Sequence, residues 1–209
     1  MRVVEGCRFG GGVSLGPAYP HVPRRLREEV EGGVFHVYAR GNEKRVIFAD
    51  DVDRRAYLRM LRSAVEDHGW RLLAYCLMEN HVHLLIETPR ANLGAGMQWL
   101  HGTYAGCFNK RHDRSGHLFQ GRYGAKRIKT YAQLWATVAY IAMNPVEAEL
   151  CRLPEDWPWS SHPMALGGTA PDWIDVRHLL EYFAAAGGDG RRRYAELFLI
   201  KGSDPLEGG

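Results

Sequence analysis

The sequence predicts an α+β fold of the ferredoxin-like, split βαβ type, with a mostly antiparallel sheet of four to five strands. Strand-like and helix-like patterns follow one another in the order β, α, β, β, α, β. Two of the strand patterns are separated only by Met78-Glu79-Asn80, which indicates an antiparallel hairpin. In this fold the helices cover one face of the sheet, so we expect the other face to be free for a ligand and for an additional helix.

Each element follows from its local pattern. Alternation of apolar and polar residues, bounded by Gly32-Gly33 and Gly41-Asn42, predicts the first strand. Apolar residues at helical spacing before Gly69 predict the first helix. The expected strands span residues 34–39, 71–77, 81–87 and 124–129, and the expected helices span 51–68, 93–110, 130–144, 146–151, 176–185 and 191–200.

The helix expected at 130–144 has clear signals at both ends. Thr130 is a good N-cap, and Gln133 three residues later completes a capping box. Pro145 disfavours the α conformation of the residue before it, so the helix should end near Asn144. Tyr140 and Asn144 are one turn apart and should share a face of this helix.

Length and composition indicate one compact domain with extensions. We expect a flexible N-terminal extension over residues 1–23, a central domain over 24–162 and a C-terminal helical extension over 163–209. No apolar run approaches the ~20 residues needed to span a bilayer, so no membrane partner is expected. The four cysteines are scattered and form no CxxC pair, which favours a reducing, cytoplasmic location.

Two histidines lie two residues apart in the third strand pattern. Strand side chains alternate between faces, so His81 and His83 should project from one face while Val82 points to the other. Two imidazoles on a rigid strand can form a preformed pair of metal ligands. They can equally be two polar groups that bind partners within the protein. The spacing alone does not choose between these interpretations.

Positive charge is concentrated in residues 110–129, where seven Lys and Arg side chains face one acidic residue, Asp113. Residues 112–123 of this stretch are glycine-punctuated and contain aromatic side chains. A local cationic stretch with aromatics is typical of a nucleic-acid interface, and its alternative is a solvated loop. The N-terminal Arg24 and Arg25 are either an arm that contacts phosphates or a solvated tail.

Five stretches together resemble one protein family. The segment around His81-Val82-His83 matches the HUH motif, which is histidine, a bulky hydrophobe and histidine. In this and four other stretches the chain resembles single-tyrosine HUH transposases, most closely the REP-associated tyrosine transposase branch. The five stretches are residues 37–42, 79–85, 116–123, 140–146 and 154–161, and the resemblance covers residues 24–162. Ala142 departs from the pattern, because the branch often has histidine there.

The resemblance implies a metal-dependent DNA endonuclease and strand transferase. By this match Tyr140 is the nucleophile, and His81, His83 and Asn144 bind a divalent metal, Mg²⁺ or Mn²⁺. Tyr140 would cleave single-stranded DNA, leaving a 5′-phosphotyrosine and a free 3′-hydroxyl. The implied partner is single-stranded DNA containing a hairpin, bound by a monomer or a homodimer.

The resemblance and the charge pattern together predict a DNA-binding surface. Its basic and hydrogen-bonding members should contact phosphates, and its aromatic members should stack on unpaired bases. The predicted DNA-binding residues are Arg24, Arg25, Arg40, Lys110, Arg111, Arg114, His117, Phe119, Gln120, Arg122, Tyr123, Lys126, Arg127 and Lys129.

Two other functions fit parts of the same pattern. One is a nucleic-acid-binding module that keeps the fold but does not cut DNA, which the joint presence of His81, His83 and Tyr140 argues against. The other is an HUH replication or conjugation nickase. Such nickases are usually larger, with helicase or primase domains, and the present 209 residues favour the transposase.

Overall fold

The computed structural model describes residues 30–185 and 187–199. Its sheet has four antiparallel strands in the order β2-β3-β1-β4. The strands are β1 (Gly33–Arg40), β2 (Arg71–Leu77), β3 (His81–Thr88) and β4 (Gly124–Ile128). Two long helices, α1 (Asp51–His68) and α2 (Leu93–Arg111), connect them. The α+β, split βαβ prediction is confirmed, with four strands in the described sheet. The predicted Arg24 and Arg25 lie outside the described residues.

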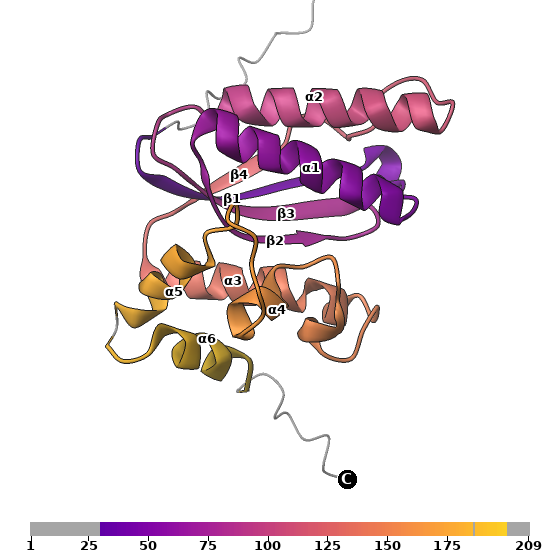
Figure 1. The fold of residues 1–209 in the computed structure, drawn as a ribbon. Coiled ribbons are helices and arrows are strands. Elements are labelled where there is room, and N and C mark those ends of the chain that lie inside the picture. Colours follow the sequence, from indigo (N-terminus) through magenta and orange to yellow (C-terminus); the bar gives the residue numbers. More distant parts are fainter. Residues whose placement is uncertain (1–29, 186, 200–209) are drawn as a thin grey trace, which may run out of the picture.

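The elements form three layers (Figure 1). Helices α1 and α2 cover one face of the sheet, and the helices that follow β4 lie on the opposite side. These are α3 (Tyr131–Glu147), α4 (His162–Leu166), α5 (Val176–Ala184) and α6 (Gly190–Leu199). Apolar residues of α4 to α6 belong to the same buried cluster as the sheet, while the expected domain division after residue 162 stays a prediction. No helix in the described part of the chain is both long and apolar enough to cross a membrane.

Side-chain alternation in β3 builds the core between the sheet and its two covering helices. Val82, Leu84 and Ile86 are almost completely buried, as the strand pattern predicted. Tyr57 of α1 and Tyr104 of α2 are buried too, and their rings meet edge to face at 5.0 Å. This packing makes the strands a rigid support for the side chains on the other face.

The outer edge of β2 is covered by chain segments that follow α3. The amide of Leu77 donates to the Trp159 carbonyl at 2.9 Å, and the amide of Ser161 donates to the Tyr75 carbonyl at 3.0 Å. Further along the strand, the amide of Asp175 donates to the Leu72 carbonyl at 2.8 Å. The backbone groups of this edge are therefore paired within the chain rather than left open.

Helix α3 extends past its proline, so the prediction of an end near Asn144 was wrong. The helix runs to Glu147, with Pro145 inside its last turn. The separate helix expected at 146–151 does not form. Proline costs the helix one donor, but the amides of Ala148 and Leu150 still bind the carbonyls of Asn144 and Pro145 at 3.1 and 2.9 Å. These bonds satisfy the last turn, so the helix continues.

A buried carboxylate holds α5 against the sheet. Glu87 of β3 is only 7% exposed and accepts hydrogen bonds from Arg71 at 2.9 Å and from the Tyr182 hydroxyl at 2.8 Å. Its other oxygen lies 2.8 Å from Nε2 of His178, whose Nδ1 lies 2.9 Å from a Glu181 oxygen. Burial disfavours the charged imidazole, but hydrogen bonds to Glu181 and Glu87 outweigh it and raise the pKa of His178 above its usual value.

This contact predicts a pH-dependent contribution to stability. Because the folded state raises the pKa of His178, the imidazolium stabilises the fold fully below the unfolded pKa of about 6.5 and loses its effect as pH rises through the folded pKa. In urea titrations from pH 5.5 to 8.5, His178→Gln should be less stable than the wild type at low pH, and the gap should narrow as pH rises. Arg177→Gln, a change on the exposed side of the same helix, should give a constant gap. A constant gap for His178→Gln would contradict this account.

Candidate functional site

The pairing of β1 with β3 gathers polar and aromatic side chains on the sheet face away from α1 and α2. In the antiparallel register Tyr38 is opposite His83, and Arg40 is opposite His81. Directly opposite residues share a face, and residues two apart on one strand do as well. His36, Tyr38, Arg40, His81 and His83 therefore lie on one face, as the sequence predicted for each strand separately.

Helix α3 brings Tyr140 to this face. The Tyr140 ring centre lies 5.2 Å from that of His83 and 5.8 Å from that of His36. Tyr140 is 41% exposed, so its phenol is open to solvent beside the imidazoles. The helix starts where the capping signal placed it, with the Thr130 hydroxyl accepting from the Gln133 amide at 3.2 Å.

Asn144 meets the first histidine of the pair. Its side-chain oxygen lies 2.8 Å from Nε2 of His81, and Asn144 itself is buried. The other ring nitrogen of His81, Nδ1, lies 2.7 Å from the Asn80 side-chain oxygen. If Nδ1 of the neutral ring donates to Asn80, Nε2 carries a lone pair that faces a second acceptor oxygen. Two such donor atoms close together suit a bound cation.

His36 meets the second histidine, and sequence reasoning assigned it no role. Its Nε2 lies 3.0 Å from Nδ1 of His83. Burial lowers the pKa of His83 to about 3 and that of His36 to about 4, so both imidazoles are neutral at pH 7. Nε2 of His83 is buried and has no hydrogen-bond partner. Only its position on the same face of β1 as Tyr38 and Arg40 pointed to His36 in the sequence.

These atoms fit a metal site of two imidazoles and one amide oxygen. Among the described residues there is no group of three or more His, Cys, Asp or Glu side chains that could hold a metal. The predicted set is different, because Asn144 supplies its third atom. The unpartnered Nε2 of His83 and the adjacent acceptors of His81 and Asn144 are compatible with that set.

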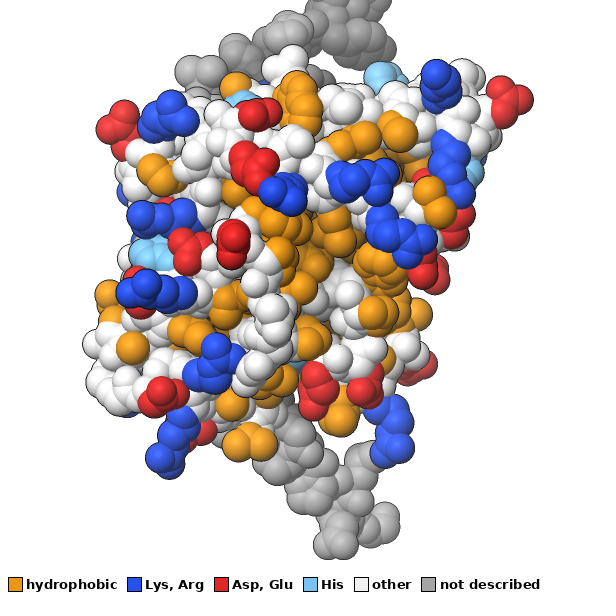
Figure 2. Space-filling view, in the orientation of Figure 1, with side chains coloured by type: hydrophobic (Ala, Val, Ile, Leu, Met, Phe, Trp, Pro, Cys, Tyr) orange, Lys and Arg blue, Asp and Glu red, His pale blue; other side chains and the backbone are white. Residues whose placement is uncertain are grey.

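The predicted DNA-binding residues are not all on one surface. Lys126 pairs with His36 across β1 and β4 and is exposed on the site's face, whereas Arg127 pairs with Phe35 and points to the opposite face. Lys110 and Lys129 are exposed at the ends of their elements. On the face shown in Figure 2, basic and acidic side chains are mixed around apolar ones. The cationic stretch of the sequence is thus divided in space.

Several members of the predicted surface have partners inside the protein. Phe119 and Tyr123 are buried, and Phe119 stacks on His101 with ring centres 4.3 Å apart. In these positions their rings are not open to bases. The Arg111 guanidinium forms ion pairs with Asp50 and Asp53, each at 2.6 Å, and Arg114 lies over the Phe108 ring.

The glycine-rich loop after α2 ends beside the candidate site. The amide of Gln120 donates to the Arg40 carbonyl at 2.9 Å, so the loop is attached to the end of β1. His117, Gln120 and Arg122 are exposed and line a cavity of about 520 Å³ between the loop and α2. These exposed side chains can reach a ligand bound near His81.

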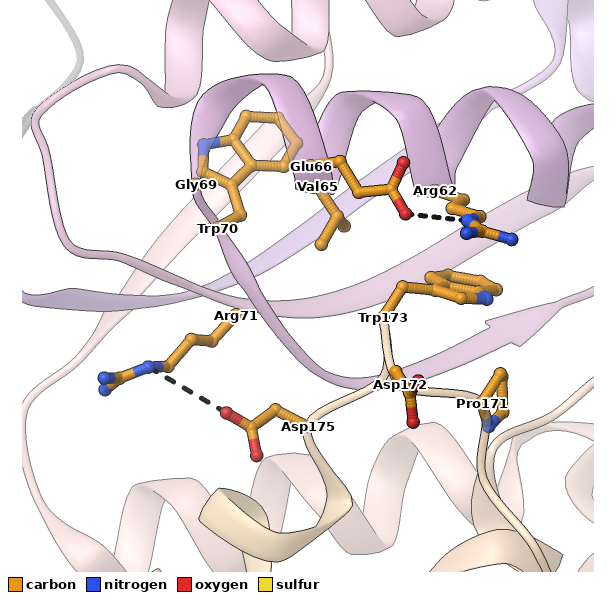
Figure 3. Close-up of a pocket in the computed structure, with 10 residues that line it drawn as sticks. All are labelled: Arg62, Val65, Glu66, Gly69, Trp70, Arg71, Pro171, Asp172, Trp173 and Asp175. Carbon is orange, nitrogen blue, oxygen red and sulfur yellow. Dashed lines mark hydrogen bonds and ion pairs between the residues drawn. The ribbon is translucent and has the colours of Figure 1, made fainter.

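A second cavity, of about 570 Å³, has no connection with the predicted site (Figure 3). It lies between α1, the start of β2 and the segment 171–175, where Trp173 is one of its walls. Its arginines are paired, Arg62 with Glu66 at 2.7 Å and Arg71 with Asp175 at 3.9 Å. None of the residues that the sequence singled out for catalysis, metal binding or DNA binding lines it.

Comparisons with known proteins agree with this arrangement. A family model described as "Transposase IS200 like" matches residues 29–144, which include His36, the two strand histidines, Tyr140 and Asn144. None of the curated proteins compared with the chain matches it.

Two solved structures are similar in fold. One is a REP-associated tyrosine transposase bound to a REP hairpin, with 16% sequence identity and a TM-score of 0.60 over 73% of this chain and 93% of that chain. The other is a putative transposase from Deinococcus radiodurans, with 20% identity and a TM-score of 0.41 over 58% of this chain and 96% of that chain.

The buried histidine pair predicts unusual titration. In the metal-free protein, ¹⁵N NMR should find the His36 and His83 rings neutral from pH 8 to pH 5, because burial lowers both pKa values. In the urea-unfolded chain the same rings should titrate near the ordinary value of about 6.5. Depressed pKa values stabilise the fold above that value, and the stabilisation is lost as pH falls. Titration of either folded ring near 6.5 would contradict the observed burial.

Proposed function

Because the family match covers more than half of its residues, the chain belongs to the IS200-like transposase family, and we propose that it cleaves and rejoins single-stranded DNA with Tyr140 as the nucleophile. Family membership supports DNA transposition as the process. The single observation that carries the proposed chemistry is the 5.2 Å between the ring centres of Tyr140 and His83, on a face shared with His81 and Asn144.

The reaction is a phosphoryl transfer to the phenol. The Tyr140 oxygen forms a bond to phosphorus as the bond from phosphorus to the 3′ oxygen breaks. The phenol loses its proton and the leaving oxygen gains one, which yields a 5′-phosphotyrosine and a free 3′-hydroxyl. The covalent intermediate conserves the energy of the broken bond, so reversal with another 3′-hydroxyl joins strands without ATP.

A divalent metal would be held by His81, His83 and Asn144. When bound, such an ion polarises a phosphate oxygen and orients the phosphodiester. The amide oxygen suits a hard cation and the imidazoles suit a transition metal, so of Mg²⁺ and Mn²⁺ the second matches this donor set better. The protein's own contribution is to keep the imidazoles neutral and fixed on a strand.

His36 acts as a positioning residue in this proposal. If Nδ1 of His83 donates to Nε2 of His36 across their 3.0 Å separation, the free Nε2 of His83 keeps its lone pair. Hydrogen bonds of this kind fix the tautomer and orientation of metal-binding histidines. His36 would thus select the form of His83 that can bind a cation.

The proposed DNA partner is a single strand that contains a hairpin, as in the REP-associated branch. The fold likeness to a transposase bound to a REP hairpin supports this choice. On this chain the exposed Arg40 and Lys126 flank the site, and Arg122 with its neighbours extends the surface along the loop. Whether the chain acts as a monomer or a homodimer does not alter the chemistry at Tyr140. We propose the cytoplasm as its location.

The nucleophile is tested with labelled single-stranded hairpin DNA and Mn²⁺. The wild type should form a covalent adduct that resists denaturing electrophoresis, and Tyr140→Phe should form none while it binds DNA nearly as well. Tyr131→Phe is the matched control, since Tyr131 lies on the same helix and is 52% exposed. Chelation with EDTA should abolish the wild-type adduct. An adduct that persists in Tyr140→Phe assigns the nucleophile elsewhere, and its absence from the wild type favours a binding module.

The DNA surface is tested through salt dependence. The double variant Arg122→Ala/Lys126→Ala should bind single strands more weakly, and its plot of log K against log salt should be shallower by about 0.7 for each phosphate that the protein no longer neutralises. The control is Arg55→Ala/Arg59→Ala, which removes two exposed charges from α1 on the other side of the sheet. Equal slopes for the wild type and the Arg122/Lys126 variant would remove both residues from the interface.

A further inference from the structure

Tyr38 is a second exposed aromatic residue in the candidate site, and the proposed reaction gives it no role. It lies on β1 between His36 and Arg40 and is 38% exposed. Its ring centre is 5.4 Å from that of His36 and 6.4 Å from that of His83. Within the described part of the chain its hydroxyl has no hydrogen-bond partner. The ring is therefore neither buried core nor part of a polar network.

The Tyr38 ring is held in place by the absence of a side chain on the next strand. Gly124 of β4 is directly opposite Tyr38 in the sheet. A Cβ built on Gly124 would lie 2.3 to 2.7 Å from three atoms of the Tyr38 side chain, which is closer than atoms can approach. The ring thus occupies the space above the Gly124 backbone. An aromatic group fixed in this way loses little freedom when a ligand packs on it.

The surroundings of Tyr38 are those of a site for single-stranded nucleic acid. Lys126 projects from β4 on the same face and Arg40 follows on β1, and both are exposed. Tyr140 lies on the other side of the His36–His83 pair, with its ring nearer to His83 than the Tyr38 ring is. Surfaces that bind single strands combine cationic side chains along the backbone with aromatic rings under the bases.

We propose that Tyr38 is the platform on which an unpaired base stacks, next to the phosphate that Tyr140 attacks. The proposal rests on the function proposed above. A base is joined through its sugar to the phosphate, so a ring 6.4 Å from His83 is within one nucleotide of a phosphate held there. Stacking uses the face of the ring and not its hydroxyl. This separates a platform from a second nucleophile, which would need the hydroxyl.

The test measures binding in a background that cannot cut. In Tyr140→Phe protein, fluorescence anisotropy gives the affinity for a 20-nucleotide oligothymidylate and for an abasic backbone of the same length and charge. Tyr38→Leu should weaken binding of the oligothymidylate by about 5- to 100-fold, and Tyr38→Phe should not, because stacking needs only the ring. Neither variant should change binding of the abasic backbone.

A matched control and the fold of the variants complete the design. Trp99→Leu removes another exposed aromatic, 40% exposed, from α2 on the opposite layer, and should bind both probes like its parent. Unfolding midpoints equal to the parent's show that the variants fold. Three results would overturn the platform: full binding by Tyr38→Leu, an equal loss on the abasic backbone, or an equal loss in Tyr38→Phe. Because no cleavage is measured, a failure of Tyr140 chemistry is seen separately in the adduct assay.

Discussion

The register of β1 against β3 is the constraint on which the site depends. It sets His83 opposite Tyr38 and His81 opposite Arg40, and it brings His36 within 3.0 Å of His83. A slip of one residue would send every one of these side chains to the other face, into the space filled by α1 and α2. The buried Val82, Leu84 and Ile86 prevent that slip, because they would then be exposed. The hydrophobic core thus fixes the geometry of the polar face.

The sequence predicted those parts of the site that depend on local spacing. Alternation along a strand placed His81 and His83 together, and the turn of a helix placed Tyr140 beside Asn144. The order of elements was enough for the split βαβ topology. Joining the two groups required the packing of α3 on the sheet, which local patterns do not encode. The resemblance to a family supplied that step in advance.

Other features depend on contacts between distant residues and could not be read from the sequence. The His36–His83 contact links residues 47 apart. Burial of Phe119 and Tyr123, and the pairing of Arg111 with two aspartates of another helix, remove residues from a surface that composition alone had favoured. Pro145 misled for a related reason: hydrogen bonds from the residues after it satisfy the last turn of α3, although the local rule predicts an end.

The two edges of the sheet differ in a way that bears on self-association. The β2 edge already carries hydrogen bonds to the Trp159–Ser161 stretch and to Asp175, whereas β4 pairs with β1 alone in the described sheet. Ribbon-like polymers grow by adding a strand to each side of every unit. A molecule with one side blocked can join a single neighbour through its backbone and then stops. The tail that closes β2 therefore acts as a chain terminator against fibril growth.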